Sequence, residues 1–168
     1  MSVDFIDPKK QLKLYIRDLL GIKECHIASG RDNAYSNQED LLVVVDDLAP
    51  AVQQSVTKTY DGSDNVEEMT IDAAMLGQFT VNFYGNKNKA RESAYIFSTL
   101  RNTEGSKTLQ KTYGISIFRV SSITDLRQLA GKTYHERYEI TLNVGYNITN
   151  TIGTLRFDEA QFEFLYDK

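Results

Sequence analysis

The stretch YEITLNVGYNI, residues 138–148, decides the fold because it is the cleanest period of two in the chain. Apolar residues occupy every second position from Tyr138 to Ile148, and polar residues or glycine stand between them. Since successive side chains of a strand point to opposite faces of a sheet, the pattern predicts a strand with one buried and one solvated face. Such strands are typical of antiparallel sheets. The predicted fold is therefore built around an antiparallel sheet.

Further strands are predicted on both sides of this stretch. Phe79, Val81 and Phe83 alternate with polar residues, which indicates a second half-buried strand. The continuous apolar run Leu41–Val45 predicts a strand that is central or buried on both faces. Apolar residues of both parities in Ile115–Ile123 predict a central strand or a bulge. Shorter strands are expected at Lys23–Ala28, Ile152–Phe157 and Phe162–Tyr166, and residues 124–133 are expected to be a plain connection.

Two helices are predicted. Asp7 followed by Pro8 is a favourable helix start, and an apolar stripe runs on to Gly21, a favourable stop. A second helix is expected after Gly85, with Ala90, Ala94, Phe97 and Leu100 on one side. These elements predict an α+β fold, with two helices packed on one face of an antiparallel sheet.

A long hairpin is expected over residues 52–75, because the turn-forming residues 61–65 lie between two strand-like segments. Polar residues are frequent in both segments, so we expect polar side chains on both faces and a tip that projects from the core. A projecting hairpin needs a partner surface or stays mobile. Its candidate interface residues are Lys58, Tyr60, Asp61, Asp64, Glu67 and Glu68.

Composition excludes several classes of function. The 168 residues fit one domain, expected to span residues 1–168, and 41% hydrophobic with 25% charged residues is ordinary for a globular protein. The net charge of −4 argues against broad binding to nucleic-acid phosphates. The chain contains no apolar signal segment and no run long enough to cross a membrane, so we expect neither secretion nor membrane insertion.

No combination of residues predicts catalysis, a metal site or a bound cofactor. Cys25 is the single cysteine, and His26 and His135 are the only bases for a nucleophile. A Cys25–His135 pair is not excluded by the sequence, but a small buried cysteine is the common case. The adjacent carboxylates Asp46-Asp47 and Glu67-Glu68 do not face one another across a substrate, so turn or interface roles are expected. We therefore expect no catalytic, cofactor-binding or metal-ligating residues.

In their order and residue patterns, these segments resemble those of the neck or tail terminator proteins of tailed bacteriophages. The more specific part of the resemblance is FYGNKNKARESAYIFSTLR followed by GISIFRVSSITDL and ERYEITLNVGY. The resemblance extends from about Gln11 to Thr149. Its segments are IASGRDNAYSNQEDLLVVV (27–45), FTVNFYGNKNKARESAYIFSTLRN (79–102), YGISIFRVSSITDL (113–126) and YHERYEITLNVGYNIT (134–149).

The resemblance implies a structural, non-enzymatic virion protein assembled in the host cytoplasm. It implies a homo-oligomeric ring, commonly a hexamer, that ends the tail tube and joins the tail to the head. The implied partners are the tail tube or sheath protein and the head-tail connector, with DNA passing transiently through the channel. A mildly acidic chain suits such passage, because attraction to phosphates would hold the genome.

Two other functions remain open on the sequence alone. A tail tube or tail completion protein would have a similar build, but a tube subunit would polymerise instead of stopping at one ring. A small cytosolic enzyme or ligand-binding domain would need titratable residues that converge in a pocket.

Overall fold

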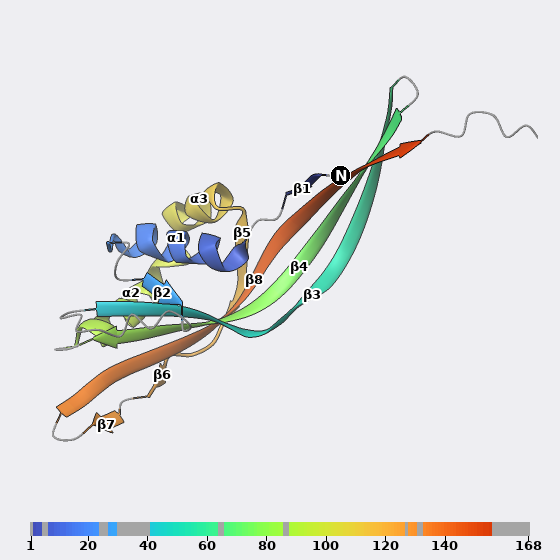
Figure 1. Ribbon diagram of the computed structural model, residues 1–168. Coiled ribbons are helices and arrows are strands. Elements are labelled where there is room, and N and C mark those ends of the chain that lie inside the picture. Colours follow the sequence, from blue (N-terminus) through green and yellow to red (C-terminus); the bar gives the residue numbers. More distant parts are fainter. Residues whose placement is uncertain are drawn as a thin grey trace, which may run out of the picture.

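The structure is a computed structural model that describes residues 2–4, 7–23, 27–29, 41–63, 66–85, 88–126, 128–130 and 133–155. Within these residues it is α+β, with an eight-stranded sheet and three helices. The predicted fold class is confirmed. The helices lie together over one end of the sheet, and its longest strands extend well beyond them (Figure 1).

Three long strands form the central part of the sheet. They are β3 (Leu41–Ser63), β4 (Val66–Gly85) and β8 (Thr133–Leu155). Each is antiparallel to its neighbour, and β4 lies between the other two. The expected strands at 41–45 and 79–83 are therefore continuous with the two segments of the expected hairpin.

Five short strands line the edges of this ribbon. Along the outer edge of β8 lie β1 (Ser2–Asp4), β5 (Ile115–Val120), β6 (Thr124–Asp125) and β7 (Gln128–Ala130), all antiparallel to it. On the other side, β2 (Ile27–Ser29) pairs with the start of β3. The order across the sheet is β1, β8, β4, β3 and β2.

Three details differ from the sequence-based expectation or refine it. Strand β2 is parallel to β3, so the sheet is mixed at this edge. The segment 124–133, expected to be a plain connection, contains β6 and β7. Strand β5 has a bulge between Ile117 and Arg119, one of the two alternatives that its mixed parity left open. The expected strand Phe162–Tyr166 lies outside the described residues.

The two predicted helices are present. Helix α1 (Pro8–Leu20) begins where the Asp7 carboxylate accepts hydrogen bonds from the amides of Lys9 and Lys10, and it ends at Gly21 in the left-handed conformation. Helix α2 (Lys89–Leu100) buries Ala90, Ala94 and Phe97, the side that its periodicity predicted.

A third helix, α3 (Glu104–Thr112), was not predicted. Thr103 caps its start, and its Oγ1 accepts a hydrogen bond from the Ser106 amide. Ser106 is the buried residue of this helix. Because no apolar residue of α3 is fully buried, hydrophobic periodicity gave no signal for it.

The core lies between the helices and one face of the sheet. Phe97 of α2 packs between Tyr15 of α1 and Phe83 of β4, with ring centroids 6.4 Å and 5.9 Å away respectively. The fully buried residues Val81 and Ile140 extend this core along β4 and β8. The clean alternation of residues 138–148 thus marks the inner face of β8, as predicted.

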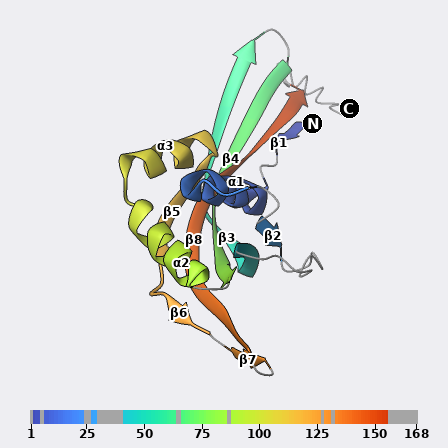
Figure 2. The same cartoon turned by 90° about the vertical axis from the view of Figure 1, so that its left-hand side faces the viewer.

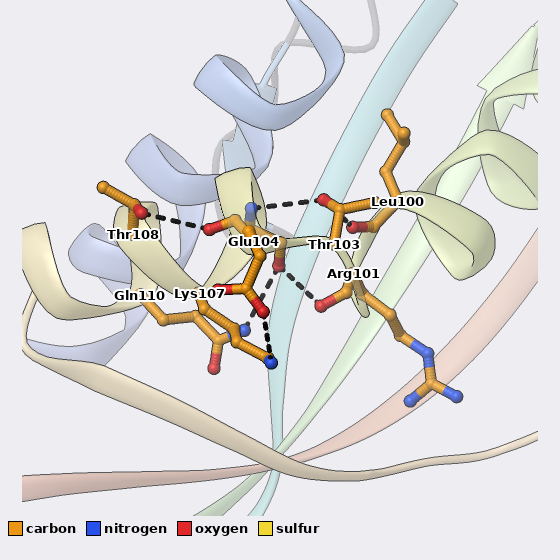
Figure 3. A network of polar contacts seen from close by, with 8 residues as sticks. Leu100, Arg101, Thr103, Glu104, Lys107, Thr108 and Gln110 are labelled. Atoms are coloured by element: carbon orange, nitrogen blue, oxygen red, sulfur yellow. Dashed lines mark hydrogen bonds and ion pairs between the residues drawn. The ribbon is translucent and has the colours of Figure 1, made fainter.

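A polar network joins α3 to the end of α2 and to α1, and Figure 3 shows its contacts around Arg101 and Gln110. The Ser106 hydroxyl donates to the Arg101 carbonyl at 2.6 Å and accepts from the Gln110 amide at 3.2 Å. Its oxygen also lies 2.7 Å from the Tyr15 hydroxyl. The single hydroxyl proton of Ser106 is donated to the Arg101 carbonyl. Tyr15 is therefore the donor in the hydrogen bond between Tyr15 and Ser106.

Replacing this serine tests the network. Ser106→Ala leaves the buried Tyr15 hydroxyl and the Arg101 carbonyl without their partner, so we expect a loss of about 1–3 kcal/mol in the free energy of unfolding. The measurement is urea unfolding of the purified chain. The double variant with Tyr15→Phe should cost less than the two single changes together, because both remove one shared interaction. Strict additivity would contradict the network.

Candidate assembly surfaces

The three long strands continue beyond the helices as an arm. We define the arm as residues 55–63 of β3, 66–74 of β4 and 147–155 of β8, with β1 beside β8. Its register is regular throughout, from Ser55↔Ala74 to the last pair Ser63↔Val66. Figure 2 shows the arm extending away from the helices, with β1 alongside.

One face of the arm is more apolar than the other, and we call it the apolar face. Val56, Ala73 and Ile148 form one cross-strand row, and Lys58, Ile71 and Asn150 form the next. Val56 is 42% exposed. Polar residues therefore lie on both faces of this part of the hairpin, with Lys58 and Asn150 on this one. This face is the more apolar of the two because every second residue of β4 is apolar here and β8 adds Ile148 to it.

The opposite face of the arm is polar. Its rows are Thr57, Asp72 and Thr149, and then Thr59, Thr70 and Thr151. The Thr149 hydroxyl donates to the Asp72 carboxylate at 2.6 Å. Within the described side chains of these rows there is no lysine or arginine. This face therefore presents hydroxyls and a negative charge.

The two edges of the arm differ in whether another strand pairs with them. Beyond Val45, where β2 ends, no strand of the described chain pairs with the outer edge of β3, so that edge is open from Asp46 to Ser63. The outer edge of β8 is paired with β1 at Thr149–Thr151. Beside those residues β1 is the outermost strand. An open strand edge offers unpaired backbone groups to another chain.

Five of the six predicted interface residues belong to the strands of this arm. Lys58 is exposed, on the apolar face. The backbone register places Tyr60 opposite Met69, Asp61 opposite Glu68, and Gly62 opposite Glu67. Asp64 lies outside the described residues. Their role in an interface stays a prediction.

The region where the arm meets the helix-covered part is irregular in several strands. Strand β3 shifts register three times between Asp47 and Ser55 and contains Pro50 there. On β4, Gly77 has no room for a larger residue, because an added Cβ would lie 2.8 Å from the Phe79 ring. On β8, the ring of Phe118 covers Gly145. Bulges and glycines of this kind increase twist and permit a bend.

A hollow of about 610 Å³ lies beside this irregular region, lined by residues that include Met75, Phe118 and Tyr146. Burial, with the Asp47 and Asp7 carboxylates nearby, raises the pKa of the Tyr146 hydroxyl. The hydroxyl is therefore protonated at neutral pH. No histidine or carboxylate lines the hollow among the described residues.

The other candidate chemical groups have structural partners or lie outside the described residues. Lys9 of α1 reaches both Asp46 and Asp47, with N–O distances of 3.6 Å and 3.2 Å, so this carboxylate pair ties the helix to β3. Hydrogen bonds from Arg17 and Tyr113 lower the pKa of Asp18, which thereby ties α1 to the end of α3.

Of the remaining candidates, only the backbone of His135 is described. Cys25 and His26 fall in a part of the chain that the structure does not describe, and His135 is paired with Gln128 through the backbone of β7. In the described part of the chain no group of three His, Cys, Asp or Glu could hold a metal. No helix there is long and apolar enough to cross a membrane.

Sequence reasoning missed two features of the assembly surfaces. Strand β1 is only three residues long and has no pattern of its own. The apolar face of the arm is visible only when three strands are aligned, although the alternation Met69, Ile71 and Ala73 was a signal within β4.

Comparison with known proteins identifies the family. A family model described as phage neck terminator protein matches residues 10–167. A comparison with curated proteins found no match. The family is one of structural virion proteins that act with other head and tail proteins. The chain belongs to the phage neck terminator protein family.

Proposed function

We propose that the whole chain acts as one domain that assembles into a closed ring, a hexamer, at the end of the tail tube. The ring stops growth of the tube and joins the tail to the head connector, so its partners are the tail tube or sheath protein below and the connector above. DNA passes transiently through its channel. The observation that carries this proposal is the arm, a two-faced extension of the sheet with an open edge.

The arm supports a ring because a ring needs two different surfaces on each subunit. Heterologous contacts of this kind close only at the correct rotation. The open edge of β3 is one such surface, and Lys58 lies beside it. Tyr60, Asp61, Asp64, Glu67 and Glu68, at and near the tip, are proposed to contact a neighbouring subunit or the adjoining ring.

The family match favours a terminator over a tail tube or tail completion protein. The two functions predict different particles when the protein is absent. A tube subunit polymerises along the tail, so without it no tube forms. A terminator acts once at the end of the tail, so without it tubes still form.

Deletion of the gene tests the proposal. We expect filled or empty capsids to accumulate beside unjoined or overlong tails, and infectious particles to fall to background, because nothing else closes and joins the tail. Electron microscopy of lysates measures this, and a plasmid copy of the wild-type gene is the control that restores joined particles. Normal joined particles after deletion would overturn the proposal, and loss of all tubes would favour a tube subunit.

A further inference from the structure

Four strands lie side by side across the arm, and both outer edges of this set are unpaired in the described chain. At one level, Val3 of β1 pairs with Asn150 of β8, Asn150 with Ile71 of β4, and Ile71 with Lys58 of β3. The strands at the two outer edges are β1 and β3. The arm therefore presents two different open edges at the same level along its strands.

The directions of these edge strands are complementary. Each strand of the set is antiparallel to the next, so β1 and β3 run in opposite directions. If β1 of one copy lies beside β3 of another, the antiparallel order continues across the junction without a break. Each contact joins two different edges, and a heterologous contact of this kind can close into a ring.

The open edge of β3 in the arm contains no proline and no register shift, and Lys58 is its one lysine. Pro50 and the three register shifts precede Ser55, and from Ser55 to Ser63 the strand is regular. Val56, Thr57 and Thr59 favour extended backbone. Long regular edges are templates for strand addition unless they are covered.

We propose that β1 of each copy pairs with the arm of β3 in the next copy, so that the arms of the ring form one continuous antiparallel barrel. The partner is thus a second copy of this chain. This inference rests on the proposed ring and specifies the contact that closes it. The polar face of the arm lines the inside of the barrel.

The position of the helices decides which face is inside. Alternate residues of β4, from Phe83 and Val81 to Ala73 and Ile71, belong to one face of the sheet, and the helices pack on that face where it holds the core. A helix layer on the inner side would fill the channel, so this face is the outer one. Thr57, Thr59, Thr70, Asp72, Thr149 and Thr151 then face the channel.

The number of strands is sufficient for a channel. Barrels of roughly 16 strands already leave an aqueous channel. Each copy supplies the four strands β1, β8, β4 and β3. Four copies would reach that size, and a hexamer would exceed it.

Disulfide trapping tests the contact. In a Cys25→Ser background, Val3→Cys is combined with Val56→Cys, Lys58→Cys or Tyr60→Cys, because barrel closure staggers the register. Within one copy Val3 and Lys58 are about 14 Å apart across three strand spacings, which is too far for a disulfide. The matched controls combine Val3→Cys with Thr57→Cys or Thr59→Cys, which lie on the opposite face of β3.

The variants are expressed in cells infected with the gene-deletion phage, and tails are purified and oxidised. We expect at least one same-face pair to give a ladder of covalent multimers that reducing agent collapses, and the opposite-face pairs to stay monomeric. A pair that does not restore infectivity is oxidised as purified chain at high concentration, where the absence of linked dimers counts against the contact.

The outcome separates this inference from the function on which it rests. Joined, infectious particles that contain the ring but yield only monomers from all three pairs would overturn the edge pairing and leave the terminator function intact. Normal particles from the gene deletion would remove the terminator function itself.

Discussion

Lysines on the polar face of the arm should slow the passage of DNA and make it dependent on salt. In the variant Thr57→Lys, Thr59→Lys, Thr151→Lys, the face proposed to line the channel changes from hydroxyls to a basic surface. A ring that gains six or more phosphate contacts holds DNA with an affinity that changes by about 10³–10⁵-fold between 50 and 200 mM salt. The release of DNA from triggered particles, measured by dye fluorescence at the two salt concentrations, should therefore be strongly slowed at 50 mM.

Two controls distinguish charge in the channel from damage to the arm. Glutamines at the same three positions change size without charge and should leave the release rate close to wild type. Asn150→Lys adds a positive charge beside Thr151 but on the other face, so it should not slow release. Release of the triple-lysine variant at the wild-type rate in 50 mM salt would show that this face does not line the channel.

Phe97→Ala should lower the free energy of unfolding by about 3–5 kcal/mol. Phe97 is fully buried, and its ring joins Tyr15 of α1 to Phe83 of β4. Its removal leaves a cavity where the two helices meet the sheet. Because domains of this kind have a total stability of about 5–15 kcal/mol, the variant should lose a large part of it. Urea unfolding followed by circular dichroism measures the difference.

The matched control removes another aromatic ring from the same helix. Tyr95 is 52% exposed and has the Arg91 guanidinium over its ring. Tyr95→Ala should cost less than about 1 kcal/mol, since exposed substitutions usually have small effects. Equal losses from the two variants would mean that α2 does not use Phe97 as its anchor on the sheet.

The parts of the fold that were predictable from the sequence are those determined by residues close together in the chain, such as strand alternation and helix caps. The alternation from Tyr138 to Ile148 predicted both a strand and its buried side, and its apolar positions are buried as far as Tyr146, whereas Ile148 in the arm is partly buried. Asp7, Pro8 and Gly21 predicted the ends of α1 because capping is a local interaction. The mixed parity of β5 indicated a central strand or a bulge, and the strand has a bulge.

The parts that were not predictable depend on partners distant in sequence. Helix α3 is held by Ser106, whose partner Tyr15 belongs to another helix, so hydrophobic periodicity could not show it. The bulges of β3 interrupt its alternation, and one strand of 23 residues therefore looked like two. The assembly surfaces were recognised only as a polar hairpin, because the faces of the arm are defined by β4 and β8 together.

The unbroken run of the long strands from the core to the tip has a mechanical consequence. Strands β4 and β8 are paired continuously from Gly85↔Glu136 near the helices to Val66↔Leu155 at the far end. A pull on the tip along the strands is opposed by all these backbone hydrogen bonds in parallel, loaded in shear, instead of one after another as in unzipping. The arm should therefore resist extension along its strands.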